Sequence, residues 1–372
     1  MKLRSMLLFL MLLAVAVPAF AIGEITPTPA PILSEQEYLA QASDQLNQSN
    51  YGGAVETLSQ LLRQFPDNAE GYFLRGTSYT ALARNSLALD DYTRAISLLP
   101  YNWDFYTARG DVFAALGEQE NALSDFEKSI DLNPRYVAGY YRLSDFYRLL
   151  NDEEQALIYF TMASGISASE FGDPEQALTD LNDVLERVRD DDNLKAYAFY
   201  NRALIHFNDG DLTAAFRDSS SAAEYYPDMH DIYLLRGTIH RLQGDQQQSG
   251  ADQYRRITLL ENKQQQRVIL ENRSTLAMDY GVVGVLEMTC EVGDNAVVSA
   301  RDLEGSSVDP LIAILDPSGE PIAGDDDSGG GTFDLDSLID DLPITQDGAY
   351  TIFISHANGG YTGAVFVEYE CK

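Results

Sequence analysis

A 34-residue period runs through the first two thirds of this 372-residue chain. Prolines, small residues and aromatic residues each return at this interval, as in Pro66, Pro100 and Pro134; Ala54, Ala88 and Ala122; and Tyr38, Tyr72, Tyr106 and Tyr140. Each proline ends a helix because it lacks an amide hydrogen and clashes with the preceding turn. A period of this length predicts a solenoid of helix–turn–helix units that bury their apolar faces against one another.

The pattern resembles the tetratricopeptide repeat, whose motif has an aromatic residue at its fourth position, small residues at the eighth and twentieth, and proline at the thirty-second. In this frame the repeats are residues 35–68, 69–102, 103–136, 137–170, 196–229 and 230–263. Residues 171–195 depart from it, since they hold a single helical stretch after Asp173-Pro174. They predict either a broken repeat or a longer connecting helix. The resemblance implies an all-α solenoid over residues 35–263 that is irregular at 171–195.

Two positions of the repeat vary together. Position seven is arginine in four repeats, and position twenty-three, sixteen residues later, is aspartate in the same four. Where the arginine is missing, the aspartate is missing too. We therefore predict structural ion pairs between the two helices of one repeat, because a half-buried charge is tolerated only when it is paired. The alternative is that these arginines face a ligand. The predicted pairs are Arg75–Asp91, Arg109–Asp125, Arg202–Asp218 and Arg236–Asp252.

The N-terminus has the pattern of a secretory signal peptide. Lys2 and Arg4 precede an apolar run from Met6 to Val17, and Ala19-Phe20-Ala21 follows as a small-x-small cleavage site. Twelve apolar residues are too few to cross a bilayer, which needs about 20. We therefore expect a signal peptide at 1–21, a Pro- and Thr-rich linker at 22–34, no membrane span, and an exported protein located outside the cell, on its surface or in the periplasm.

The residues after the solenoid change to short β-branched stretches separated by Gly, Asp and Pro, such as LIAIL at 311–315 and YTIFI at 350–354. Short strands with frequent turn signals predict an all-β sandwich over 268–372, so the fold class is α + β in two domains. Cys290 and Cys371 both lie in this domain. An even pair of cysteines in an exported protein predicts a disulfide.

This C-terminal part resembles the bacterial pre-peptidase C-terminal domain. The likeness lies in Leu315-Asp316-Pro317-Ser318-Gly319, in Asp325-Asp326-Asp327-Ser328-Gly329 and in Gly348-Ala349-Tyr350-Thr351-Ile352. It implies a jelly-roll-like accessory module, and some relatives bind calcium. Hard cations want clustered oxygen ligands, but the spacing of a calcium loop is absent, which leaves solvated acidic turns as the alternative. The candidate calcium ligands are Asp309, Asp316, Asp325, Asp326 and Asp327.

Charge and motif content exclude several functions. The formal net charge of −33 disfavours nucleic acid and anionic lipid as partners, since both are bound mainly through Lys and Arg. The sequence has no HExxH, GxSxG, phosphate-loop or CxxC motif. Because no catalytic constellation stands out, we expect a protein that is not an enzyme and that needs no cofactor apart from the calcium considered above.

The resemblance to the tetratricopeptide repeat implies a concave groove lined by positions two, five, nine and twelve. These positions are rich in acidic and aromatic residues, so the predicted partner is a protein or peptide that is basic or bears aromatic groups. The predicted function is an exported protein–protein interaction scaffold. The alternative is a module that binds carbohydrate or the cell envelope through the sandwich. The groove candidates are Glu70, Phe73, Asp104, Asp111, Tyr141, Asp145, Tyr200 and Asp231.

Overall fold

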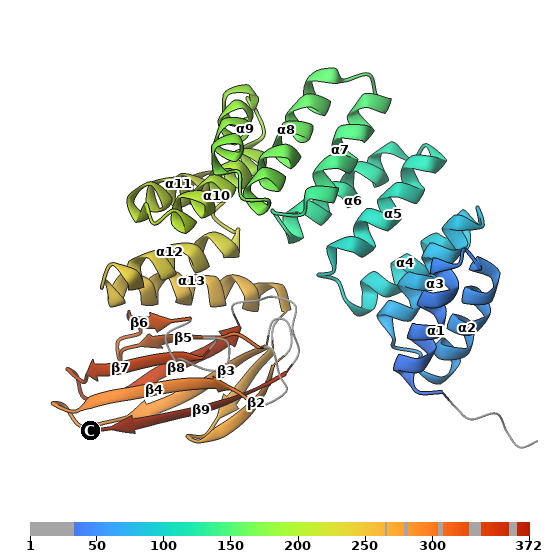
Figure 1. The fold of residues 1–372 in the computed structure, drawn as a ribbon. Coiled ribbons are helices and arrows are strands. Elements are labelled where there is room, and N and C mark those ends of the chain that lie inside the picture. The colour runs from blue at the N-terminus through green and yellow to red at the C-terminus, as the bar shows by residue number, and fades with distance from the viewer. Residues whose placement is uncertain (1–32, 265, 279–281, 304–307, 327–335, 357–362) are drawn as a thin grey trace, which may run out of the picture.

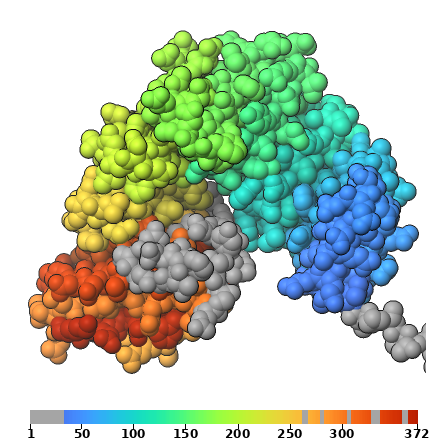
Figure 2. Space-filling model, in the orientation of Figure 1, coloured from blue at the N-terminus to red at the C-terminus, as the bar shows by residue number. Residues whose placement is uncertain are grey.

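The computed structural model describes residues 33–264, 266–278, 282–303, 308–326, 336–356 and 363–372. The expected signal peptide (1–21) and residues 22–32 of the expected linker lie outside the described residues. An arch of paired helices leads to a β-sandwich at its C-terminal end (Figure 1). The space-filling view shows the same arch with an open space beneath it (Figure 2). The predicted α + β organisation, a helical solenoid followed by sheets, is confirmed.

The described part of the solenoid forms thirteen helices that alternate in direction. They are α1 (Glu35–Asn47), α2 (Tyr51–Gln64), α3 (Ala69–Ala81), α4 (Asn85–Leu98), α5 (Trp103–Leu116), α6 (Gln119–Leu132), α7 (Val137–Leu149), α8 (Glu153–Glu170), α9 (Pro174–Arg187), α10 (Asp192–Asn208), α11 (Leu212–Tyr225), α12 (His230–Leu242) and α13 (Gln246–Gln264).

Small residues at position eight let the two helices of a repeat approach each other. A Cβ atom added at Gly76 would lie 2.8 Å from Cε1 of Tyr92, and one added at Gly110 would lie 2.8 Å from Cε1 of Phe126. Both aromatic rings are buried, at 2% exposure. The ring of the second helix therefore packs directly on the backbone of the first, and this contact is why the period needs glycine or a similarly small residue there.

The irregular segment at 171–195 is a repeat that shares a helix with the repeat before it. Helix α8 has 18 residues, and its C-terminal half packs against α9 as a first helix packs against a second. The Ser164 hydroxyl donates to Asp180 at 2.6 Å, sixteen residues away, which is the spacing of the arginine–aspartate pairs. Gly165 follows as the small residue of position eight, where an added Cβ would lie 3.1 Å from Cβ of Asp180. Thus α9 is neither a lone helix nor a connector.

Sharing α8 brings together repeats that are not consecutive in the chain. The Tyr226 hydroxyl, after α11, donates to Asp131 in α6 at 2.7 Å. The amide of Asn201 in α10 donates to the carbonyl of Pro134, after α6, at 3.0 Å. A simple solenoid makes contacts only between adjacent repeats. These hydrogen bonds instead join residues 95 and 67 positions apart.

The C-terminal domain consists, in its described residues, of two sheets packed face to face. One sheet has the order β1-β3-β8-β5-β6 and the other β2-β9-β4-β7, with β1 parallel to β3 and the other pairs antiparallel. The strands are β1 (Gln266–Leu270), β2 (Ser274–Met278), β3 (Val282–Thr289), β4 (Asn295–Asp302), β5 (Pro310–Leu315), β6 (Pro321–Asp325), β7 (Ser337–Pro343), β8 (Ala349–His356) and β9 (Gly363–Cys371).

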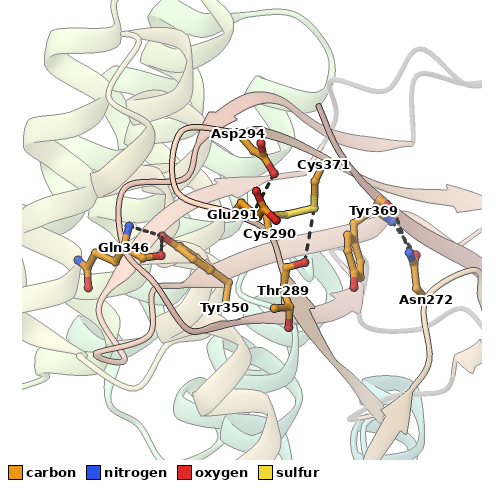
Figure 3. Close-up of a disulfide and its surroundings, with 9 residues drawn as sticks. All are labelled: Asn272, Thr289, Cys290, Glu291, Asp294, Gln346, Tyr350, Tyr369 and Cys371. Carbon is orange, nitrogen blue, oxygen red and sulfur yellow. Dashed lines mark hydrogen bonds between the residues drawn. A yellow bond between two sulfur atoms is a disulfide. The ribbon is translucent and has the colours of Figure 1, made fainter.

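A disulfide joins Cys290, just after β3, to Cys371 at the end of β9, as the sequence predicted (Figure 3). The two cysteines are 81 residues apart. The bond therefore ties the last strand of one sheet to the other sheet. Two residues before Cys371, Tyr369 exchanges two hydrogen bonds with Asn272, of 2.9 and 3.0 Å.

Helix α13 packs on the outer face of the first sheet, where it contacts β3, β5, β6 and β8 (Figure 1). Ile257 of α13 packs in one cluster with Val283, Leu311 and Phe353, while alternate strand residues face the other sheet. All six residues of β5 are buried. An added Cβ at Gly250 would lie 2.6 Å from the carbonyl of β6. The helix thus lies too close to the strand for any larger residue.

Candidate functional site

The predicted arginine–aspartate residues lie between the two helices of their repeats. In three repeats the guanidinium Nε and Nη2 both donate to a buried carboxylate, with distances of 2.7 and 2.7 Å for Arg75–Asp91, 2.8 and 2.8 Å for Arg109–Asp125, and 2.6 and 2.9 Å for Arg202–Asp218. Planar guanidinium groups match carboxylates in this two-bond geometry. These contacts hold the two helices of one repeat together.

The fourth predicted pair is looser. Arg236 Nε lies 3.4 Å from Asp252 Oδ2, and these two atoms form no hydrogen bond with each other. Burial raises the pKa of the Asp252 carboxyl to about 6, and the nearby Arg236 only partly opposes this. His240 Nε2 lies 3.7 Å from the same carboxylate, and burial lowers the pKa of this histidine. The equivalent His206 lies 3.7 Å from Asp218.

Three predicted groove residues of the third and fourth repeats have polar partners, and one of these partners, Arg142, lies in the neighbouring repeat. Asp104 accepts the Tyr136 hydroxyl at 2.6 Å, and Asp111 lies 3.0 Å from Nε of Arg142. Burial raises the pKa of the Asp111 carboxyl, and Arg142 opposes that shift. In the same region, Asp145 pairs with Arg148 of its own helix at 3.0 Å.

The other three residues predicted from the first four repeats differ in exposure. Glu70 is exposed on α3. Phe73 packs inside the solenoid, with its ring 4.9 Å from that of Phe105. Tyr141 is 36% exposed, and its ring lies 5.8 Å from Phe160. The structure therefore does not gather the predicted groove residues of these repeats into one pocket.

Tyr200 and Asp231 do meet in one cavity, at the C-terminal end of the groove. The cavity has a volume of about 400 Å³. Positions five, nine and twelve of two consecutive repeats line it, namely Tyr200, Leu204 and Phe207 from α10 and Leu234, Thr238 and Arg241 from α12. Asp231, at position two, completes this set. We call this cavity the inner groove pocket.

The sandwich closes one side of the inner groove pocket. Asp309 and Asp326 belong to its lining. The Thr238 hydroxyl donates to Asp326 at 2.5 Å, and Arg241 Nε lies 3.3 Å from Asp326 and 3.5 Å from Asp325. Two groove positions of the last repeat thus hold the acidic turn after β6. The pocket is therefore built by both domains.

The candidate calcium ligands have protein partners. Asp325 Oδ2 accepts the backbone amide of Leu338 at 2.7 Å, in addition to the contact with Arg241. Asp316 accepts three hydrogen bonds from Ser318 and Glu320 in the β5–β6 turn, which lower the pKa of its carboxyl. Asp309 is buried at the domain interface, and Asp327 lies outside the described residues. In the described part of the chain, no three His, Cys, Asp or Glu side chains form a group that could hold a metal.

Sequence reasoning missed Leu204, Phe207, Leu234, Thr238 and Arg241. The signal was present, because each occupies a groove position of the repeat frame. The groove residues predicted from the sequence were acidic and aromatic ones, whereas this end of the groove is lined mainly by apolar residues and by the cation of Arg241. The contact between α12 and β6 has no counterpart in the repeat pattern.

Comparisons with known proteins identify the repeat. Residues 39–103 and 162–219 match one tetratricopeptide repeat model, and residues 104–136 match another. The second matched segment begins within α8, in agreement with the shared helix. The photosystem I assembly protein Ycf3 of Cyanophora paradoxa is 35% identical over 82 residues, which are 22% of this chain and 47% of that protein. The chain thus spans about half the length of this curated relative.

Solved structures of repeat proteins are similar to parts of this chain. The MamA protein is 16% identical, covers 52% of this chain and 92% of its own, and has a TM-score of 0.33. A tetratricopeptide repeat protein from Parabacteroides merdae ATCC 43184 is 22% identical, covers 62% and 94%, and has a TM-score of 0.31. None of the helices within the described residues is long and apolar enough to cross a bilayer. Within the helical part, residues 39–136 and 162–219 are thus similar to the tetratricopeptide repeat.

Proposed function

We propose that this protein is an exported, non-catalytic scaffold that holds a protein or peptide partner in the inner groove pocket. The observation that carries the proposal is the repetition of one set of groove positions in two consecutive repeats around a cavity of about 400 Å³. Tetratricopeptide repeat proteins bind protein partners, and stacked repeats present such positions along a continuous surface.

The chemistry of the pocket favours a partner with an apolar or aromatic side chain next to a positive charge. Leu204, Phe207 and Leu234 supply apolar walls that are only partly buried. Three carboxylates and one guanidinium also line the pocket, so its formal charge is negative. Burial of an apolar side chain there would supply affinity, and the carboxylates would orient the cation.

Further observations support the scaffold role and export. The related Ycf3 is described as a photosystem I assembly protein, which supports a role in bringing proteins together. The signal-peptide pattern of residues 1–21 and the Cys290–Cys371 disulfide support export. We assign the sandwich as an accessory module of the pre-peptidase C-terminal type that fixes one wall of the pocket.

Site-specific photocrosslinking of the full-length chain tests this proposal. A benzoylphenylalanine at Phe207 lies in the pocket, whereas one at Phe171, which is 87% exposed, lies outside its lining. We expect the probe at Phe207 to crosslink a discrete partner in the exported fraction and the probe at Phe171 to leave that partner unlabelled.

Competition completes the test. A synthetic peptide from the crosslinked partner should bind the purified protein, and Leu234→Asp should abolish that binding without loss of helicity. Equal labelling from both probe positions, or a peptide that binds Leu234→Asp as well as the wild type, would overturn the proposal.

A further inference from the structure

A second cavity is lined by residues of α5, α6, α8 and α10. Its volume is about 540 Å³, and its lining includes Tyr106, Glu127, Asp131, Tyr159, Asp191 and Tyr226. A neighbouring cavity of about 450 Å³ shares Glu127, Tyr159 and Asp191 with it. We call the two together the tyrosine cavity. It contains none of the predicted groove residues, and it exists because the shared helix brings α6 next to α10.

Two acceptors of the tyrosine cavity have no partner within the described residues. Tyr159 is only 3% exposed, its ring stacks on Tyr147 at 5.4 Å, and its hydroxyl makes no hydrogen bond in the described part of the chain. The Glu127 carboxylate likewise makes neither a hydrogen bond nor an ion pair with any described residue. Glu127 is exposed to solvent, so its carboxylate alone implies no ligand. A buried side chain with an unpartnered hydroxyl is costly, so Tyr159 points to a ligand.

The charges around the cavity leave an excess of negative charge. Arg109 is paired with Asp125, and Lys128 Nζ lies 2.6 Å from Asp131. Two further arginines line the smaller cavity, Arg187, which pairs with Asp183 at 2.7 Å, and Arg189. Burial raises the pKa of the Glu127 carboxyl, and the nearby negative charge of Asp191 raises it further. Six carboxylates and four cations line the two cavities together, and this excess of negative charge favours a cationic ligand.

The Asp191 side chain also caps a helix, and this contact fixes the position of its carboxylate. Its Oδ1 accepts the backbone amide of Leu194 at 2.9 Å and so caps α10. The carboxylate is thereby fixed at the rim of both cavities. A ligand that binds here meets a pre-positioned acceptor and does not need to order a loop.

We propose that the tyrosine cavity receives an arginine side chain of a protein partner. The guanidinium has five N–H donors in a planar fork, which suit the carboxylates of Glu127 and Asp191 together with the hydroxyl of Tyr159. Tyrosine faces attract a cation within about 6 Å of the ring centre. The proposal shares with the proposed function only the idea of a protein partner, because the two cavities have no lining residue in common.

The test uses the full-length protein and a heptapeptide with one central arginine between glycines and serines. Ligand-observed NMR at low ionic strength should detect its binding. The same peptide with citrulline, which has the same shape without the charge, should bind roughly tenfold more weakly or not at all. Glu127→Gln, Tyr159→Phe and Asp191→Asn should each weaken the arginine peptide several-fold, and Asn keeps the cap of α10.

Glu120→Gln is the matched control, because Glu120 is an exposed acid on the same helix and removal of its charge changes the net charge equally. It should bind the arginine peptide as the wild type does. Equal binding of the citrulline or a lysine peptide, equal loss in Glu120→Gln and Glu127→Gln, or absence of binding would each overturn the proposal. Leu234→Asp, the groove variant, should bind this peptide normally, so failure of one proposal is distinguishable from failure of the other.

Discussion

The Arg109–Asp125 pair should contribute more to stability than the Arg236–Asp252 pair, although the sequence pattern treats them alike. Asp125 is 5% exposed and accepts two hydrogen bonds at 2.8 Å from an arginine whose side chain is 19% exposed. Breaking a buried pair by removal of one partner costs about 3–5 kcal/mol. Because water reaches part of Arg109 and Thr93 also accepts from it, we expect Asp125→Ala to cost about 2–4 kcal/mol.

A double-mutant cycle separates the pair from the rest of each side chain. Arg109→Met, Asp125→Ala and the double variant would be unfolded in urea and followed by circular dichroism at constant m-value. We expect a coupling free energy of about 1.5–3 kcal/mol, against less than about 1 kcal/mol for the same cycle on Arg236 and Asp252. A coupling below about 0.5 kcal/mol for Arg109–Asp125, or an equal value for both pairs, would refute this reasoning.

Three further outcomes follow from the geometry. The pKa of Asp252 is raised to about 6, above its unfolded value, so its contribution to stability is fully present below about pH 4 and is lost as the pH rises through 6. In urea unfolding, the free energy of unfolding of Asp252→Asn should therefore rise relative to that of the wild type by up to about 3 kcal/mol between pH 4 and pH 7. A difference between the two proteins that stays constant with pH would contradict the raised pKa. Gly250→Ala should cost about 1–3 kcal/mol, because its Cβ would lie 2.6 Å from the backbone of β6. Gly52→Ala, which meets nothing within 4 Å, should not lower the melting temperature. Replacement of Cys290 and Cys371 by serine should cost roughly 4–5 kcal/mol in the unfolding of the sandwich, given a loop of about 80 residues, and an unchanged denaturation midpoint would contradict a closed disulfide.

The parts of the fold that depend on local spacing could be predicted from the sequence. Arginine and aspartate sixteen residues apart meet because a helix, a turn and a second helix return the chain by that interval. Cys290 and Cys371 could be paired since no other cysteine competes. These inferences need only the repeat frame or a count of residues.

The shared helix could not be predicted from the 34-residue frame, because that frame assigns every helix to a single repeat. Gly165, Ala177 and Asp180 occupy positions eight, twenty and twenty-three of a repeat that starts inside the previous one. Only an overlapping frame would have found them. Ser164 replaces the arginine of position seven, so the arginine–aspartate correlation of the other repeats does not identify this one.

The sequence indicates the interface between the solenoid and the sandwich less directly. The stretch LIAIL at 311–315 is apolar without alternation, and such a strand is typically buried on both faces. That observation predicts a further layer on the sheet but does not identify it as α13. The contact between Arg241 and Asp325 joins residues more than eighty positions apart, and neither residue differs in type from the many exposed charges of this chain.

The shared helix also explains why the solenoid has a cavity between α6 and α10. In a regular array each repeat is followed by a complete neighbour, which would fill the space between α6 and α10. Here α8 serves two repeats, so Asp131 of α6 contacts Tyr226 directly. The tyrosines and carboxylates of two distant repeats then surround one space that neither repeat could form alone. Since such contacts skip intermediate repeats, the stability of this solenoid is not a sum over nearest neighbours, and the repeats on either side of α8 should unfold together.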